Sequence, residues 1–402
     1  MNFDFPGSGL KRLYLKIILE QTEKDCDQAE TCYNSMRIII LMKLIKTDSI
    51  LRKGDFMIKS KRYILFSVLA VAVAAVVFGV VYFRRQPQEQ DPITATALKL
   101  NTVITITIYD SQDQSILDDA MALCDEYEQI FSRTSEDSEL YQLNAGELAD
   151  ADGISTVSDS LSDLIATGLS YAALSEGAFD ISIAPVSSLW DFTSGEGTVP
   201  DQAEVEAAVE LVDYRQVFQD GNQIHFGMDG MELDLGAVAK GYIADRLKEF
   251  LVSRGVESAI IDLGGNVLCV GERPDGTPFR IGIQRPFADR NETLAAVEIS
   301  GKSVVSSGIY ERYFEQDGVL YHHILNPKTG YPYDNGLTSV TIISEQSVDG
   351  DGLSTTAFAL GLEKGLELIN SLPDVQAIFI TEDGELHFSE NFEDEVSISY
   401  ME

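Results

Sequence analysis

Apolar and polar residues follow two different spacings along this chain. Between Ile116 and Phe131 apolar residues recur every three or four positions, which predicts an amphipathic helix. The same spacing predicts helices after the capping residue Ser158, through 242–251 and through 353–372.

Alternating or continuous β-branched residues predict strands between these helices. The expected strands are 103–109, 231–235, 259–263, 266–270, 279–283, 339–344, 377–381 and 386–389. Asp275-Gly276 is expected to pair the strand at 279–283 with its predecessor, and Asp383-Gly384 to close a final hairpin. Because helices and strands mix without strict alternation, the sequence predicts an α+β domain with mixed sheets and packed helices.

The longest apolar run, 63–83, contains no charged residue. About 20 such residues in a helix cross the hydrocarbon core of a bilayer. The run therefore predicts one transmembrane anchor, within a segment 57–85 that begins with a basic flank. A buried core helix and a cleaved signal peptide are the alternatives, although the run is longer than a signal peptide needs. Residues 86–94 are polar and predict a linker, and the body is expected to occupy 95–402.

Charge divides the chain at the same place. The 402 residues carry 29 Lys and Arg against 65 Asp and Glu, a net charge of −36. Residues 1–89 hold 14 of the basic and 9 of the acidic residues, which leaves 15 and 56, a net charge of −41, in 90–402. An acidic body excludes an ordinary nucleic-acid binder, and four cysteines are too few for a disulfide scaffold. We expect a single-pass protein of the cell membrane with an extracytoplasmic body.

Residues 1–56 fit neither part. Their apolar stretch is interrupted by Lys43 and is too short to span a bilayer. Met57 opens a complete basic and apolar anchor sequence. We therefore expect 1–56 to be a non-native or cytoplasmic extension, with Met57 as the natural start.

The segment 233–241 is the first candidate for chemistry. A predicted strand ends, a glycine turns the chain, and Lys240 stands in the first turn of the next helix. Free amide groups and the positive helix end favour a phosphate there, and the lysine adds a point charge. An ordinary strand–helix junction with a surface lysine is the alternative, since no Walker or dinucleotide-binding spacing is present.

Two further segments carry polar groups at suggestive spacings. Asp351 and Thr355 are four residues apart, so they share one face of a predicted helix. Their oxygens suit Mg²⁺, and an acidic helix start without a metal is the alternative.

His322 and His323 precede a Pro–Gly turn. Either histidine is a candidate general base, and a purely structural role is the alternative.

In their order along the chain, these segments resemble the FAD:protein FMN transferases, the ApbE family. The resemblance covers roughly 98–390. The segments that carry it are SELYQLN at 138–144, GAFD at 177–180, DLGAVAKG at 234–241, GGN at 264–266, SGIYERYF at 307–314, HILNPKTG at 323–330 and DGLST at 351–355.

The resemblance implies an enzyme that splits FAD, attaches FMN through a phosphoester to a threonine or serine of an acceptor protein, and releases AMP, with Mg²⁺ required. The residues that it implies as FAD contacts are Ala178, Phe179, Asp180, Asp234, Lys240 and Leu325. The implied Mg²⁺ ligands are Asp351, Thr355 and the main chain of Ala237, with Ser354 adjacent. Asp351 and His323 are the implied catalytic residues, with His323 as the base for the acceptor hydroxyl.

The implied acceptors are flavoproteins with FMN-binding domains, such as subunits of a Na⁺-pumping quinone reductase or an Rnf-type complex. An FAD pyrophosphatase that releases FMN and AMP, and a non-enzymatic flavin-binding protein, are the alternatives. The chain departs from the family pattern at Leu100-Asn101, where many relatives have Met-Gly, at Ile309, where several have Asp or Asn, at Ala237, where the DLGG pattern has glycine, and at Gly352, where several have alanine.

Overall fold

A large antiparallel sheet forms the centre of the fold. The computed structural model describes residues 91–193, 197–289 and 292–401, which lie in a unit spanning Pro87–Glu402. The eight strands of the sheet, in spatial order, are β1 (Ile93–Lys99), β2 (Thr102–Ile108), β6 (Ser258–Asp262), β7 (Asn266–Gly271), β10 (Ser303–Gly308), β13 (Leu337–Ser344), β14 (Gln376–Thr381) and β15 (Leu386–Phe388). The α+β prediction is confirmed. The expected mixed sheets are not found in the described residues, where the neighbouring strands pair antiparallel.

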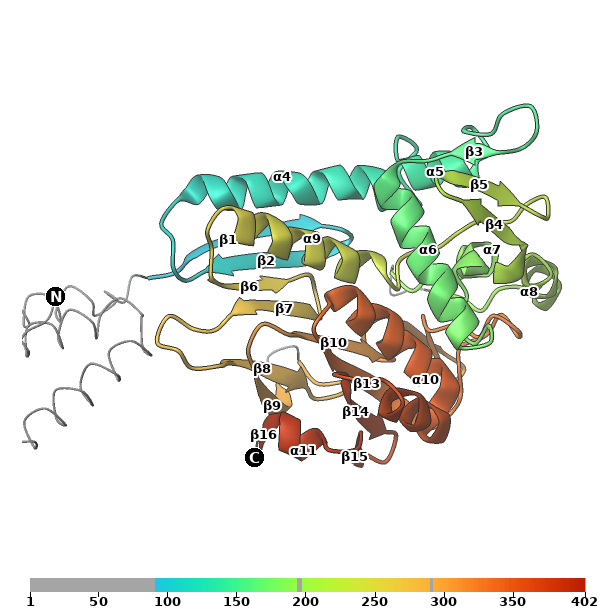
Figure 1. Ribbon diagram of the computed structural model, residues 1–402. Coiled ribbons are helices and arrows are strands. Elements are labelled where there is room, and N and C mark those ends of the chain that lie inside the picture. The colour runs from blue at the N-terminus through green and yellow to red at the C-terminus, as the bar shows by residue number, and fades with distance from the viewer. Residues whose placement is uncertain (1–90, 194–196, 290–291, 402) are drawn as a thin grey trace, which may run out of the picture. The chain divides into compact units, whose positions relative to one another are not determined.

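Three long helices lie along one face of this sheet (Figure 1). They are α4 (Gln114–Phe131), α9 (Ala239–Ser253) and α10 (Ser347–Asn370). Their apolar sides join the main hydrophobic core, in which Leu117, Leu247 and Phe358 share one cluster with Ile106 and Ile342 of the sheet. The periodic apolar spacing that predicted these helices is the spacing of their buried faces.

A smaller sheet covers part of the other face. It contains β16 (Ser397–Tyr400), β9 (Thr293–Ile299) and β8 (Phe279–Gln284), in that order, and α11 (Phe392–Glu395) lies beside it. Phe279 and Ile281 pack with Ile343 and Ile378 of the large sheet in a second core. Every residue of β13 is consequently buried. The expected pairing across Asp275-Gly276 is wrong, because β8 pairs with β9 instead.

The remaining elements connect these layers. The helical ones are α5 (Glu139–Asn144), α6 (Asp159–Leu174), η1 (Ile181–Ile183), α7 (Ala184–Ser187), α8 (Gln202–Val209) and η2 (Tyr214–Gln216). The strands are β3 (Ser155–Thr156), β5 (Gln223–Phe226) and β4 (Val217–Asp220), which form a small sheet, and the hairpin of β11 (Tyr313–Gln316) with β12 (Val319–His322). Ser158 caps α6 as predicted, since its Oγ accepts the Leu161 N–H at 3.3 Å.

Helix α10 is two helical pieces joined at a kink. Gly361 has φ 79° and ψ 176°, a conformation that essentially only glycine adopts. The break frees the carbonyl of Phe358, and Asn335 Nδ2 donates a hydrogen bond to it at 2.6 Å. The helix begins at Ser347, six residues before its predicted start at 353, so Asp351 lies inside it.

We expect Gly361→Ala to lower the free energy of unfolding by about 1–3 kcal/mol, because a Cβ strains this backbone conformation. Denaturant unfolding of the two proteins measures the loss. Gly276→Asn is the matched control. Gly276 also has a positive φ, but it has open space around it and asparagine tolerates left-handed backbone. An equal loss in both variants would show that the kink is not specially sensitive.

Within 91–193, 197–289 and 292–401, no helix has the length and hydropathy of a membrane span. The anchor expected at 63–83 and the extension expected at 1–56 lie outside the described residues. Strand β1 starts at Ile93, two residues before the expected start of the body.

Candidate active site

The site is built where the first turns of α9 and α10 meet. The amide N–H of Gly241 donates to Asp351 Oδ2 at 2.5 Å. A Cβ on Gly241 would lie 2.3 Å from the carbonyl oxygen of Ser347, so only glycine allows this approach. One turn further along α9, Asp245 accepts the N–H groups of Ser347 and Val348 at 2.8 and 2.9 Å. A carboxylate of one helix therefore caps the next and fixes how their ends meet.

Asp351 is a buried carboxylate, 5% exposed. Its Oδ1 accepts a hydrogen bond from Asn266 Nδ2 at 2.9 Å, and Ser347 Oγ donates to Asn266 Oδ1 at 2.7 Å, which orients the amide. Burial raises the pKa of Asp351, while the charge of Lys240 and the two hydrogen bonds oppose that rise. The hydrogen bonds from Asn266 and Gly241 hold the carboxylate in one orientation.

A row of hydroxyl groups continues from this carboxylate. Ser307 Oγ, at the end of β10, lies 2.8 Å from Ser354 Oγ and 3.1 Å from Thr355 Oγ1. Ser354 Oγ also donates to the main-chain oxygen of Asp351 at 3.1 Å. The predicted ligands Asp351, Ser354 and Thr355 thus lie within five residues of α10, and Ala237 lies in the turn before α9.

Lys240 stands in the first turn of α9, as predicted. Its Nζ donates a long hydrogen bond of 3.4 Å to the main-chain oxygen of Gly264, in the turn between β6 and β7. Val238 is the N-cap residue of α9, and its side chain cannot accept a hydrogen bond from the helix. No acidic residue of α9 itself occupies the first turn. Because Asp351 already accepts the Gly241 N–H, the charge of Lys240 is the main attraction that this helix end offers an anionic ligand.

The two neighbouring histidines have different surroundings. His322 Nδ1 accepts the Ile324 N–H at 3.2 Å, so its Nε2 carries the proton and donates to the Tyr333 carbonyl at 2.9 Å. Both ring nitrogens of His322 are occupied, which gives this residue a structural role. His323 Nδ1, in contrast, is buried and has no hydrogen-bond partner among the described residues.

Desolvation lowers the pKa of His323 to about 3, and the positive charges of Arg312 and Lys240, with His322, contribute to the shift. The imidazole is therefore neutral at physiological pH and can accept a proton. A buried polar atom without a partner costs free energy. The Nδ1 atom of His323 is therefore available to accept a hydrogen bond from a bound molecule.

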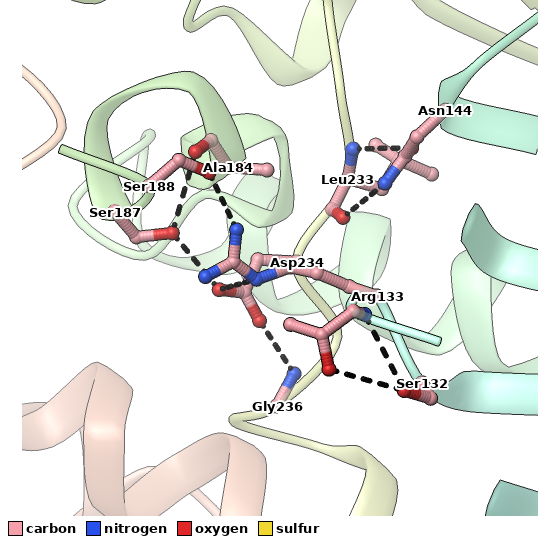
Figure 2. Close-up of polar contacts among 10 residues, drawn as sticks. Ser132, Arg133, Asn144, Ala184, Ser187, Ser188, Leu233, Asp234 and Gly236 are labelled. Atoms are coloured by element: carbon pink, nitrogen blue, oxygen red, sulfur yellow. Dashed lines mark hydrogen bonds and ion pairs between the residues drawn. The ribbon is translucent and has the colours of Figure 1, made fainter. Parts of the chain in front are cut away.

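Asp234 lies at the centre of a polar network (Figure 2). Its Oδ2 forms an ion pair with Arg133 Nε at 3.2 Å and accepts from Ser187 Oγ at 3.0 Å, and its Oδ1 accepts the Gly236 N–H at 3.0 Å. The network holds the turn that leads into α9. No pattern in the sequence singled out Arg133, which lies two residues after the end of α4 and belongs to none of the matching segments.

The expected strand at 231–235 is not formed. The N–H and C=O of Leu233 bond instead to the side-chain amide of Asn144, at 2.8 and 2.9 Å (Figure 2). A single amide side chain thus replaces a neighbouring strand. This explains why an asparagine ends the matching segment 138–144, although α5 and Leu233 are far apart in sequence.

The segment that contains Ala178, Phe179 and Asp180 lies largely in the core. Phe179 is buried, and the Ala178 carbonyl accepts from Tyr333 Oη at 2.8 Å. Asp180 caps η1 through the Ser182 N–H and also accepts the Tyr214 N–H, at 2.8 and 2.9 Å.

An open cleft of about 510 Å³ lies beside Asp180 and includes Pro327 and Lys328 in its lining. Its volume is in the range of small-molecule sites. Segments 177–180 and 323–330, which are separated in sequence, thus converge on one cleft. Asp351 and His323 do not line it, so the cleft alone does not contain the candidate chemistry.

Leu325, the remaining predicted FAD contact, packs in a third hydrophobic core together with Trp190. Trp190 Nε1 donates to the Gly330 carbonyl at 3.0 Å. The rings that surround Trp190 belong to Phe192, Phe314, Tyr321 and Tyr331. The periodicity of the sequence did not reveal this cluster, because its members come from separate loops and from a hairpin.

The structure explains one departure from the family pattern. A Cβ on Gly352 would lie 2.2 Å from the ring of Tyr171, whose hydroxyl donates to Asp349 Oδ1 at 2.5 Å. The Tyr171 ring thus occupies the space that an alanine methyl would need. Ile309, a second departure, is buried in the main core.

We expect Gly352→Ala to lower the free energy of unfolding by about 1–3 kcal/mol, because the methyl group displaces a packed ring. Thermal or denaturant unfolding measures the effect. In the Tyr171→Ala background the same change should cost much less, since the competing ring is gone. Equal costs in both backgrounds would contradict this explanation.

Comparison with known proteins identifies the family. The model of the ApbE family matches residues 100–379. The FAD:protein FMN transferase of Klebsiella pneumoniae is 38% identical over 296 residues, which are 73% of this chain and 90% of that protein. The FAD:protein FMN transferase of Treponema pallidum is 32% identical over 321 residues, 75% of this chain and 88% of that protein.

Solved structures agree with these matches. The flavin transferase ApbE from Vibrio cholerae superimposes with a TM-score of 0.68 at 25% identity, over 76% of this chain and 99% of that one. The ApbE protein from Thermotoga maritima gives a TM-score of 0.68 at 30% identity, over 75% and 98%. These similarities show that the chain belongs to the ApbE family.

Proposed function

We propose that this protein cleaves FAD, transfers the FMN part to a threonine or serine hydroxyl of an acceptor protein, and releases AMP. Membership of the ApbE family and the match to FAD:protein FMN transferases along most of their length support the activity. The observation that carries the proposal within the site is the unpartnered, buried Nδ1 of His323 close to the charge of Lys240. A neutral base beside cations suits proton removal from a hydroxyl that attacks an anionic pyrophosphate.

The donor set that the starts of α9 and α10 provide suits Mg²⁺. It offers one carboxylate, Asp351, the hydroxyls of Ser354 and Thr355, and the main-chain oxygen of Ala237. Hard oxygen ligands with a single carboxylate are typical of Mg²⁺ sites that also use substrate phosphate and water. The described residues contain no cluster of three or more His, Cys, Asp or Glu side chains suited to a metal, so the proposed site depends on substrate phosphate and water for its remaining ligands. A bound Mg²⁺ would neutralise charge on the phosphates of FAD.

The protein's own groups divide the remaining work. Lys240 and the N-terminus of α9 would bind the pyrophosphate, and the Arg133–Asp234 pair would hold the turn that positions them. Such local positive charge is needed because the body carries a net charge of −41, which repels an anionic substrate at long range. His323 would receive the proton of the acceptor hydroxyl as the hydroxyl oxygen attacks phosphorus and the AMP oxygen leaves, in an in-line displacement.

The acceptor and the location of the reaction complete the proposal. Flavoproteins with FMN-binding domains, such as those of quinone reductase or Rnf-type complexes, are the proposed acceptors. The uncharged apolar run at 63–83 supports a membrane anchor. The excess of basic residues on its N-terminal side, with Arg52 and Lys53 added to the basic flank, supports an extracytoplasmic body.

The intact mass of an acceptor tests the function. The full-length protein is incubated with FAD, Mg²⁺ and a recombinant FMN-binding domain, and the domain is then weighed. We expect a gain of one FMN as a phosphoester and an equal amount of AMP. The gain should disappear when the acceptor threonine is replaced. Free FMN and AMP in equal amounts, with no gain on any FMN-binding domain supplied, would instead identify a pyrophosphatase.

A further inference from the structure

Two aromatic side chains form an exposed platform on the body. Phe287, in the loop between β8 and β9, is 51% exposed, and Tyr313, at the start of β11, is 38% exposed. Their ring centroids lie 5.6 Å apart in an edge-to-face contact, and Phe287 makes a second such contact with Tyr310 at 6.0 Å. Exposed aromatic rings that support one another in this way are typical of binding surfaces.

The backbone of Phe287 is strained in a way that displays the ring. Its φ is 59°, which is unusual for a bulky residue and costs about 1–2 kcal/mol relative to ordinary backbone. An apolar ring in water does not repay this cost in the protein by itself. Strain kept at an exposed position is a reason to look for a function there.

The platform is continuous with the candidate active site. Tyr313 pairs with His322 in the β11–β12 hairpin. The next residue, His323, donates its N–H to the carbonyl of Arg312, which directly precedes Tyr313 in the chain. Tyr313 of the platform and His322 therefore lie opposite each other at the open end of one hairpin, and the candidate base His323 directly follows that hairpin.

Charges of both signs lie next to the platform in sequence. Arg285 and Arg312 flank it, and Asp289, Glu311 and Glu315 stand in the same two segments. No net charge therefore selects the partner here. The two exposed rings favour a partner segment that is aromatic or apolar.

We propose that the Phe287–Tyr313 platform docks the acceptor protein, holding the loop that carries the hydroxyl to be modified. The inference rests on the proposed function, because a protein substrate must approach His323 from outside. The apolar part of the acceptor loop covers the two rings. The strain at Phe287 keeps the ring in place before the acceptor arrives, so that less conformational entropy is lost on binding.

Phe287→Gly tests the docking role, since glycine removes the ring and relieves the backbone strain. The full-length variant is assayed with FAD, Mg²⁺ and an FMN-binding domain, and its Kd for that domain is also measured directly without turnover. We expect both the KM and the Kd for the acceptor to rise about tenfold, as for an aromatic interface residue. The affinity for FAD and the thermal stability should not fall.

Phe218→Ala is the matched control, because Phe218 is also 51% exposed but lies on β4 in another sheet. This variant should keep the wild-type acceptor affinity. Tyr313→Ser should reproduce the defect of Phe287→Gly.

An unchanged acceptor Kd in Phe287→Gly would overturn the proposal. A matching loss of FAD affinity would assign the platform to the FAD site, and the loss of a dimer in light scattering would assign it to a second copy of this chain. Failure of the proposed function is a separate result: it would appear as wild-type protein that binds the acceptor but adds no FMN.

Discussion

Replacing Asp351 by alanine should reduce turnover by at least about 10²-fold, because the variant loses the one carboxylate in the proposed Mg²⁺ donor set. It also leaves Asn266 Nδ2 and the Gly241 N–H without their acceptor, at a cost of about 1–3 kcal/mol in stability. Isothermal titration of Mg²⁺ into the FAD-loaded protein should show weaker binding. FAD itself should still bind, since Lys240 and the end of α9 remain.

Asp351→Asn separates charge from folding. The asparagine has the same shape, and its oxygen can accept one of the two hydrogen bonds, while its NH₂ group faces the other donor. We expect a folded protein with nearly the same loss of turnover. Asp349→Asn is the control, because it removes a charge two residues away and keeps an acceptor for the Tyr171 hydroxyl. Wild-type activity in Asp351→Asn would remove the metal assignment.

Replacing His323 by alanine should lower kcat by about 10²–10⁴-fold, the usual contribution of a general base. The pH dependence gives a sharper test. The pKa of His323 is lowered to about 3, so the free enzyme already holds a neutral imidazole throughout pH 5–8. The rate at low FAD concentration should therefore show no increase with pH near 6.5, the ordinary pKa of histidine.

The FAD complex should behave differently. Arg312, Lys240 and His322 are the groups that disfavour the protonated ring, alongside desolvation. The two negative charges of the pyrophosphate oppose these cations, so FAD binding should raise the pKa of His323. We expect kcat, measured at saturating FAD, to rise with pH at a higher value than kcat/KM does. If both profiles showed the same ascending limb, the coupling between FAD and His323 would be absent.

Most patterns confined to one element predicted it correctly, and the strand expected at 231–235 is the exception. Helix α9 has the expected period and ends before Gly255, whose φ is 83°. The strands around Gly264 and Gly265 form β6 and β7 as expected. Pairings between distant segments were not predictable in the same way. Strand β8 gives no sign in its own residues of whether it pairs with β7 or with β9, because both partners would bury the same face.

The candidate site shows the same division. Asp351, Thr355 and Lys240 could be proposed because each sits in a short segment with its own pattern. Their positions relative to one another depend on Asn266, Ser307 and Asp245, which come from other elements. The residue pattern alone also did not decide whether His322 or His323 is the general base. The hydrogen bonds of His322 Nε2 and Nδ1 distinguish the two histidines. Such contacts depend on the fold, so neighbouring residues in the sequence do not reveal them.

The position of Trp190 has a practical consequence. It is the single tryptophan of the chain, and it packs in the same small core as Leu325, the predicted flavin contact. An isoalloxazine ring bound there would quench the fluorescence of this one tryptophan. The unlabelled protein thus contains its own optical reporter, and a fluorescence titration can count flavin molecules entering and leaving the site while no chemistry takes place.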